Sequence, residues 1–144
     1  MKARALAGDY VGATANLEAI ARHYCGADVR VTWQPATTWL GLARLTPAGF
    51  EILLNPHMAA ADLPFVFQHE CAHLVHGDAT FSDTRSASDV ANVNRPAMLE
   101  RVTSSEQAAI RPVIDAREAA ADRWAFATLA AFEGRFGPFL RAIR

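Results

Sequence analysis

The chain has 144 residues, of which 51% are hydrophobic, and its 14 lysines and arginines nearly balance its 15 aspartates and glutamates. A chain of this length and hydrophobic content is typical of a single domain, residues 1–144, that buries a substantial core. Its formal net charge of -1, without a basic cluster, gives no electrostatic reason to expect nucleic acid or an anionic membrane as a partner.

The cysteines and the first residues favour a cytoplasmic location. Cys25 and Cys71 are far apart and form no CxxC pair, so neither a disulfide framework nor a thiolate zinc site is expected. The opening stretch MKARALAGDY has no apolar core of signal-peptide length. No later window approaches the roughly 18 apolar residues of a membrane span. We therefore expect a cytoplasmic protein.

The first predicted element is a helix over TANLEAIARHYC. Leu17, Ile20 and Tyr24 recur at helical spacing, Thr14 is a candidate cap, and Gly26 is a natural stop. Three short runs rich in β-branched, aromatic and aliphatic residues follow: VRVTW, WLGLARL and FEILLNP. These runs predict three strands, and the TPAG segment between the last two suits a type I turn. The simplest arrangement is an antiparallel meander.

The hydrophobic period changes at Asp62, where Pro64 suits the first turn of a largely buried helix that ends at Gly77. Residues 78–96 are polar and predict a long loop. Helical patterning returns from residue 96, and Pro112 is expected to kink that segment or to begin a new helix.

Gly134 to Arg144 then predicts a short terminal helix. Together these elements predict an α+β fold.

The stretch HECAHLVHGD contains the strongest chemical signal. On a helix, residues four apart differ by about 40° in direction and about 6 Å in height, so His69 and His73 can bind one metal ion. Glu70 lies about 100° around from His69, where it does not compete for the metal but can act as a general base. A helix that merely contains scattered histidines remains the alternative on this motif alone.

His76 shares a face with His69 but lies about 10 Å further along the helix axis, too far for both rings to bind one zinc ion. We place His76 in the surroundings of the ligands or on the surface, with direct ligation as the less favoured option. The third-histidine pattern of metzincins is also absent, because His76 and Ala79 occupy its Gly and His positions.

Glu118 and Asp122 in REAAADRWAF supply a third ligand and a supporting carboxylate. They are four residues apart in a strongly helical context and so share a face. Two histidines and one glutamate leave a fourth zinc position open, as catalytic sites require. Asp122 can accept a hydrogen bond from the far nitrogen of a liganding histidine. Taken alone, two acidic residues at this spacing usually lie on a solvent-exposed face of a helix.

HExxH followed by Glu-x-x-Ala-Asp resembles the gluzincin pattern. With GLARL, EILLNP, FVFQHECAHLVHGD and EAAADRWA, the chain is similar to the peptidase domain of the ImmA/IrrE family over roughly residues 29–78 and 113–132. The resemblance implies a compact zincin-like domain with a three-stranded antiparallel sheet. It also implies one zinc ion held by His69, His73 and Glu118, with Glu70 as the base and Asp122 orienting a ligand.

The function expected from these features is zinc-dependent hydrolysis of a peptide bond. The resemblance implies a single cytoplasmic protein target, typically a transcriptional repressor, and an extended substrate along the strand around Gly41 to Leu45. Because a tetrahedral intermediate needs a hydrogen-bond donor, His57 is the first candidate for that role. Tyr10, His23 and Tyr24 are weaker candidates. His57 as an ordinary loop residue is the simpler interpretation.

Two alternatives stay open. A metal can stabilise a protein-binding module that does not cut its partner, although the presence of Glu70 argues against this. The chain can also be a metal-free scaffold.

Overall fold

The computed structural model describes residues 5–77 and 104–142. The predicted loop at 78–96 and the helical pattern of 96–102 lie outside these residues. In chain order the elements are η1 (Ala7–Ala13), α1 (Thr14–Cys25), β1 (Val29–Trp33), β2 (Gly41–Thr46), β3 (Gly49–Leu54), η2 (Ala60–Asp62), α2 (Leu63–His76) and α5 (Ser104–Ala142). The α+β class is confirmed.

The sheet is mixed, and the predicted antiparallel meander is wrong. The strand order is β1-β3-β2, with β1 parallel to β3 and β2 antiparallel to β3. The connection at residues 34–40 carries the chain past β3 instead of turning directly into a neighbouring strand. Asn55 holds this connection, because its side-chain Nδ2 donates to the carbonyls of Ala36 and Trp39. β2 is consequently an edge of the described sheet, as the substrate expectation requires.

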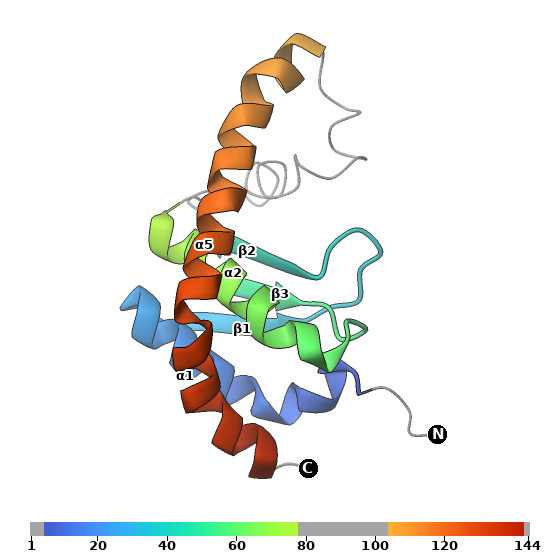
Figure 1. Ribbon diagram of the computed structural model, residues 1–144, viewed down its shortest axis with the longest axis vertical. Helices are drawn as coiled ribbons and strands as arrows, with labels where there is room; N and C mark the ends of the chain where they lie inside the picture. Colours follow the sequence, from blue (N-terminus) through green and yellow to red (C-terminus); the bar gives the residue numbers. More distant parts are fainter. Residues whose placement is uncertain (1–4, 78–103, 143–144) are drawn as a thin grey trace.

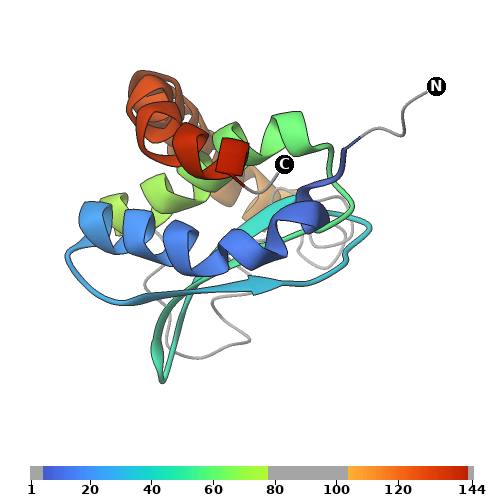
Figure 2. The ribbon, with the colours of Figure 1, turned by 90° about the horizontal axis from the view of Figure 1, so that it is seen from below.

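The helices form layers on one face of the sheet. Figure 2 shows α1 and α2 lying against the sheet and α5 packed on α2 on the side away from the strands. Apolar side chains from both helices meet alternate residues of the strands, as expected for a sheet with one face in the core. The buried cluster includes Leu17, Val31, Ile52, Phe67 and Cys71. This packing holds α2, with its histidines, between the sheet and α5.

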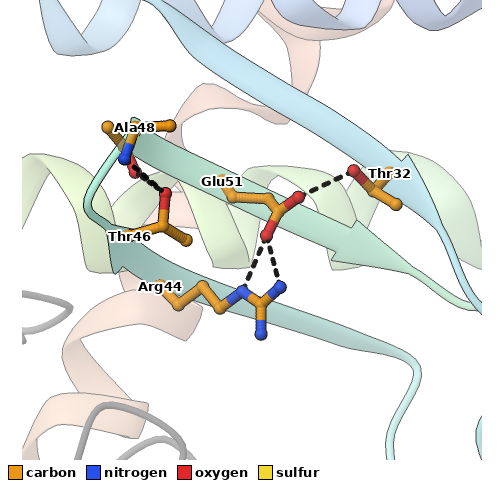
Figure 3. A network of polar contacts seen from close by, with 6 residues as sticks. Thr32, Arg44, Thr46, Ala48 and Glu51 are labelled. Carbon is orange, nitrogen blue, oxygen red and sulfur yellow. Dashed lines mark hydrogen bonds and ion pairs between the residues drawn. The ribbon is translucent and has the colours of Figure 1, made fainter. Parts of the chain in front are cut away.

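The other face of the sheet carries a polar network that ties the edge strand to its neighbour (Figure 3). Glu51 on β3 accepts a hydrogen bond from Thr32 Oγ1 of β1 at 2.8 Å. Its other carboxylate oxygen accepts from Arg44 of β2, through Nε at 2.7 Å and Nη2 at 2.6 Å. Because one carboxylate bridges all three strands, β2 is held in register by a charged pair as well as by its backbone.

The boundaries of α1 and α2 agree with their predicted stop signals. Both helices end in a glycine with left-handed backbone, Gly26 at φ 68° and Gly77 at φ 75°. Thr14 is the first residue of α1 rather than its cap, because its hydroxyl donates to Val11 O and accepts from Trp33 Nε1. Pro64 lies in the first turn of α2, where the missing N–H costs no helical hydrogen bond.

α5 differs from its prediction, because it is a single helix over Ser104–Ala142. Pro112 does not begin a new helix, and the expected separate terminal helix from Gly134 is part of the same element (Figure 1). Phe132 and Phe136 lie one turn apart on either side of Gly134 and are both fully buried. Their packing, with the rings of Phe67 and Phe132 5.4 Å apart, favours continuation of the helix past the glycine.

Candidate metal centre

α2 brings the two histidines of the motif together on one face. The Nε2 atoms of His69 and His73 are 3.1 Å apart, and the two rings meet edge to face. This geometry follows from the four-residue spacing on a regular helix. With Glu70, whose carboxylate is close by, they form a group whose ligand atoms all lie within 4.8 Å of one another. This group can hold a metal ion.

Glu118 reaches the same point from α5. Its Oε2 lies 2.7 Å from Nε2 of His69, and its Oε1 lies 3.2 Å from Nε2 of His73. Glu118 was the predicted third ligand, and the fold brings its carboxylate to the two ring nitrogens. Three side chains from two helices thus point two imidazole nitrogens and one carboxylate at the same position.

Asp122, one turn further along α5, lies against the other side of His69. Its Oδ1 is 2.7 Å from Nδ1 of the ring, while Nε2 of the same ring faces Glu118. A hydrogen bond at Nδ1 places the proton there and leaves Nε2 with its lone pair for a metal ion. The carboxylate of Asp122 therefore sets both the orientation and the tautomer that ligation needs.

The charges around His69 shift the pKa values of the site. Burial alone would lower the pKa of His69, but the hydrogen bond with Glu118 and the charges of Glu70 and Glu118 raise it above its ordinary value of 6.5. For Glu118 burial also opposes the net shift, and the hydrogen bonds with His69 and His73 lower its pKa from 4.5 to about 2. Glu118 and Glu70 thus stabilise the protonated ring of His69, and the two rings stabilise the charged carboxylate of Glu118.

The metal group is part of a longer contact between two antiparallel helices. His73 and His69 of α2 contact Glu118 and Asp122 of α5, as described above. One turn further along both helices, the ring centroids of Phe65 and Phe126 lie 4.9 Å apart. Phe126 is 70% exposed and was not predicted as part of this contact, although its position four residues after Asp122 places it on the same helix face.

Gln68 and Thr128 anchor the same helix pair beneath the site, and neither residue was predicted. The fully buried Gln68 amide donates through Nε2 to Thr128 Oγ1 at 2.9 Å and to Tyr24 Oη at 3.2 Å. This amide links α1, α2 and α5 at one point.

Glu70 lies on the side of α2 that faces β2, whereas Glu118 approaches α2 from α5. The Glu70 side chain is 7% exposed and lies next to Gly41 at the start of β2. The two glutamates therefore lie on different sides of the histidines, Glu118 on α5 and Glu70 on the part of α2 that packs against the start of β2.

The remaining candidate residues lie apart from this group. His57 is exposed in the connection after β3, where its backbone N–H donates to Asn55 Oδ1. His76 is exposed in the last turn of α2. Tyr24 binds Gln68 in the interior, and His23 lies 3.0 Å from Arg135 on the surface. Tyr10 is buried in η1. Within the described residues, none of these belongs to the group that can hold a metal ion.

The residues present fit a zinc ion. Zinc bonds of about 2.0–2.1 Å place tetrahedral ligand atoms about 3.3 Å from one another. The three separations among His69, His73 and Glu118 are 2.7, 3.1 and 3.2 Å, so the ion fits after side-chain movements shorter than a bond length. Two imidazoles and one carboxylate are also a donor set that zinc accepts.

Among the described residues, no helix combines the length and the apolar character needed to cross a bilayer. Comparison with family models, curated proteins and solved structures finds no match for this chain.

Proposed function

We propose that the chain is a zinc-dependent endopeptidase with a zincin-like arrangement of its active-site helix and sheet edge. The observation that carries the proposal is the meeting of His69, His73 and Glu118 at one point, with the second glutamate, Glu70, buried beside them. A site that only stabilises the fold is usually closed by four protein ligands. Three ligands with a separate carboxylate nearby are typical of hydrolysis.

Each residue has a distinct role in this proposal. His69, His73 and Glu118 hold the zinc ion, and Asp122 fixes the tautomer of His69 through Nδ1. Bound there, zinc supplies a Lewis acid that polarises the substrate carbonyl and makes water more acidic. Glu70 takes a proton from the attacking water and delivers it to the leaving amine. No covalent bond to the protein forms.

The substrate is expected to be an extended peptide segment of a protein target. The edge strand β2 runs beside α2, and a peptide added to this edge would pass close to Glu70. The resemblance noted above points to a cytoplasmic transcriptional repressor as the target.

The main alternative is a catalytically silent module in which the metal only stabilises a protein-binding surface. The two functions differ in what they require of Glu70. A silent module has no use for a base, whereas the peptidase depends on it.

The test compares wild type with Glu70→Gln. Zinc-loaded proteins are incubated with a proteome-derived peptide library, and new peptide termini are mapped by mass spectrometry. Glu133→Gln, the same change on the exposed surface of α5, serves as the control. We expect wild type and the control to cut, and Glu70→Gln to lose several orders of magnitude in rate while keeping its zinc. Cleavage that survives in Glu70→Gln, or no cleavage by wild type, would overturn the proposal.

A further inference from the structure

We propose that Gly41 is a positioning residue for Glu70. The missing side chain at the start of β2 leaves the space in which the stem of the Glu70 side chain lies. The inference rests on the proposed function in one respect, namely that the position of Glu70 matters because Glu70 is the base.

The space at Gly41 is already occupied from within the protein. A Cβ atom added there would lie 2.8 Å from Cγ1 of Val66 and 2.9 Å from Cγ of Glu70, with Cδ of Glu70 at 3.4 Å. Real Cβ atoms essentially never approach other atoms to under 3.0 Å. The described glycines with positive φ are Gly26, Gly49 and Gly77, so Gly41 is required for space and not for its backbone conformation.

The neighbours of Gly41 have few ways to move aside. Val66 and Glu70 are one turn apart on α2, so the helix cannot withdraw from one without the other. Val66 is β-branched and therefore stiff in a helix. α2 itself is held by the fully buried Phe67 and Cys71. The softest response to a Cβ at position 41 is rotation of the Glu70 side chain, which carries the carboxylate away from the histidines.

A glycine in an edge strand suggests close approach of a second chain. Gly41 is buried, however, and its missing side chain faces α2. The glycine therefore serves the base, while substrate binding falls to other residues of the strand.

The chain offers two matched controls for Gly41→Ala. Gly8→Ala creates a similar clash, with Cβ of Pro56 at 2.9 Å, away from α2. Gly12→Ala makes the same chemical change where nothing lies within 4 Å. Gly8→Ala thus reports the effect of steric strain on folding, and Gly12→Ala reports the effect of the methyl group alone.

The first readout is the carboxylate itself. In zinc-loaded protein labelled with ¹³C at glutamate Cδ, Glu70→Gln identifies the Glu70 signal by its loss. We expect this signal to shift in Gly41→Ala and to stay in place in Gly8→Ala and Gly12→Ala. An unshifted signal in Gly41→Ala overturns the proposal. If Gly41→Ala does not fold, Val66→Ala/Gly41→Ala relieves one of the two contacts and is measured in its place, with the same expectation.

The second readout is kinetic and uses the library peptide that wild type cuts fastest. Gly41→Ala should lower kcat by roughly 10 to 100-fold with KM unchanged, because a misplaced catalytic group mainly affects the chemical step. In the Glu70→Gln background Gly41→Ala should have no further effect. An equal loss in that background, or a change in KM alone, overturns the proposal. If wild type cuts nothing, the proposed function fails, and the carboxylate signal still decides the role of Gly41.

Discussion

At the residue scale, the chemistry of the site centres on His69, because both of its ring nitrogens face carboxylates. Nε2 lies 2.7 Å from Glu118 and Nδ1 lies 2.7 Å from Asp122. Only a doubly protonated ring can donate to both partners, so a metal ion that takes Nε2 must displace a proton. Metal affinity and protonation are therefore linked at this one side chain.

The first prediction concerns Asp122. Asp122→Asn keeps the size of the side chain but removes the charge that fixes the proton on Nδ1 of His69. Zinc affinity should fall by about 10 to 100-fold, measured by competition with a chelator. Asp115→Asn, at an exposed position two turns earlier on α5, is the control and should bind zinc like wild type. Unchanged affinity in Asp122→Asn would make this carboxylate an ordinary surface group.

The second prediction concerns the pH dependence of the zinc-free protein. The pKa of His69 is raised above 6.5, so its contribution to stability is full below pH 6.5 and is lost as the pH rises through the folded value. The pKa of Glu118 is lowered from 4.5 to about 2, so its contribution is present above pH 4.5 and is lost as the pH falls through the folded value. His69 and Glu118 should therefore stabilise the folded state most between pH 4.5 and 6.5.

The measurement is the difference in free energy of unfolding between wild type and Glu118→Gln across pH, both without zinc. That difference should shrink above pH 6.5. In wild type loaded with zinc, the free energy of unfolding should instead rise with pH over this range, because fewer protons compete with the metal at higher pH. A difference that grows above pH 6.5 in zinc-free protein would contradict the assignment of the shifts.

At the element scale, the site depends on how α5 lies on α2. The third prediction tests the buried contact beneath the metal centre. Thr128→Val keeps the shape of the side chain but removes the hydroxyl that accepts a hydrogen bond from Gln68. Unfolding in urea should show a loss of about 1–3 kcal/mol, because the buried Gln68 amide loses one of its two hydrogen-bond acceptors. The exposed Thr37→Val is the control. Equal stability of both variants would show that Gln68 and Thr128 do not anchor the helices.

The fourth prediction concerns the outer edge of β2. Asn55 N donates to Leu40 O at 2.8 Å, so the alternation of antiparallel pairs turns the N–H of Arg44 toward β3 and that of Ala43 toward the free edge. Ala43→Pro should raise KM for the library peptide by roughly tenfold, the equivalent of one lost hydrogen bond, while zinc content and kcat stay the same.

Arg44→Pro, at the next residue, is the contrasting variant for this edge. It removes a backbone hydrogen bond to β3 and also the ion pair between Arg44 and Glu51, so it should lower the melting temperature instead. If Ala43→Pro folds and its KM is unchanged, substrate does not add to β2.

At the scale of the whole molecule, a metal ion would join helices that are far apart in the chain. His73 belongs to α2 and Glu118 to α5, and their contact crosses the junction between the helix layers. The fifth prediction is that zinc at about 1,000 times its Kd stabilises the fold by about 4 kcal/mol, which raises the melting temperature by roughly 10 °C over chelator-treated protein. Calorimetry measures this shift. His73→Ala should abolish it, and His76→Ala should retain it. Equal shifts in both variants would contradict the ligand set.

The sequence by itself determined the part of the site that lies on one helix. The spacing of His69 and His73 sets their directions, because helix geometry is local. Pro64 and Gly77 mark the ends of that helix through their own backbone preferences. The positions of the three strands also follow from short apolar runs bounded by turn residues.

Only the tertiary structure decided which of these pieces meet. Local pattern could not show that β1 pairs with β3, nor that Glu118 turns inward to the histidines instead of lying on a solvated face. Packing also overrode local preference at Gly134, where buried phenylalanines on either side accompany a continuous helix. Position 41 is the clearest case, because it requires a glycine only on account of Val66 and Glu70, which belong to another element. Such contacts depend on how buried faces fit together, and sequence periodicity records which face is buried but not what lies opposite.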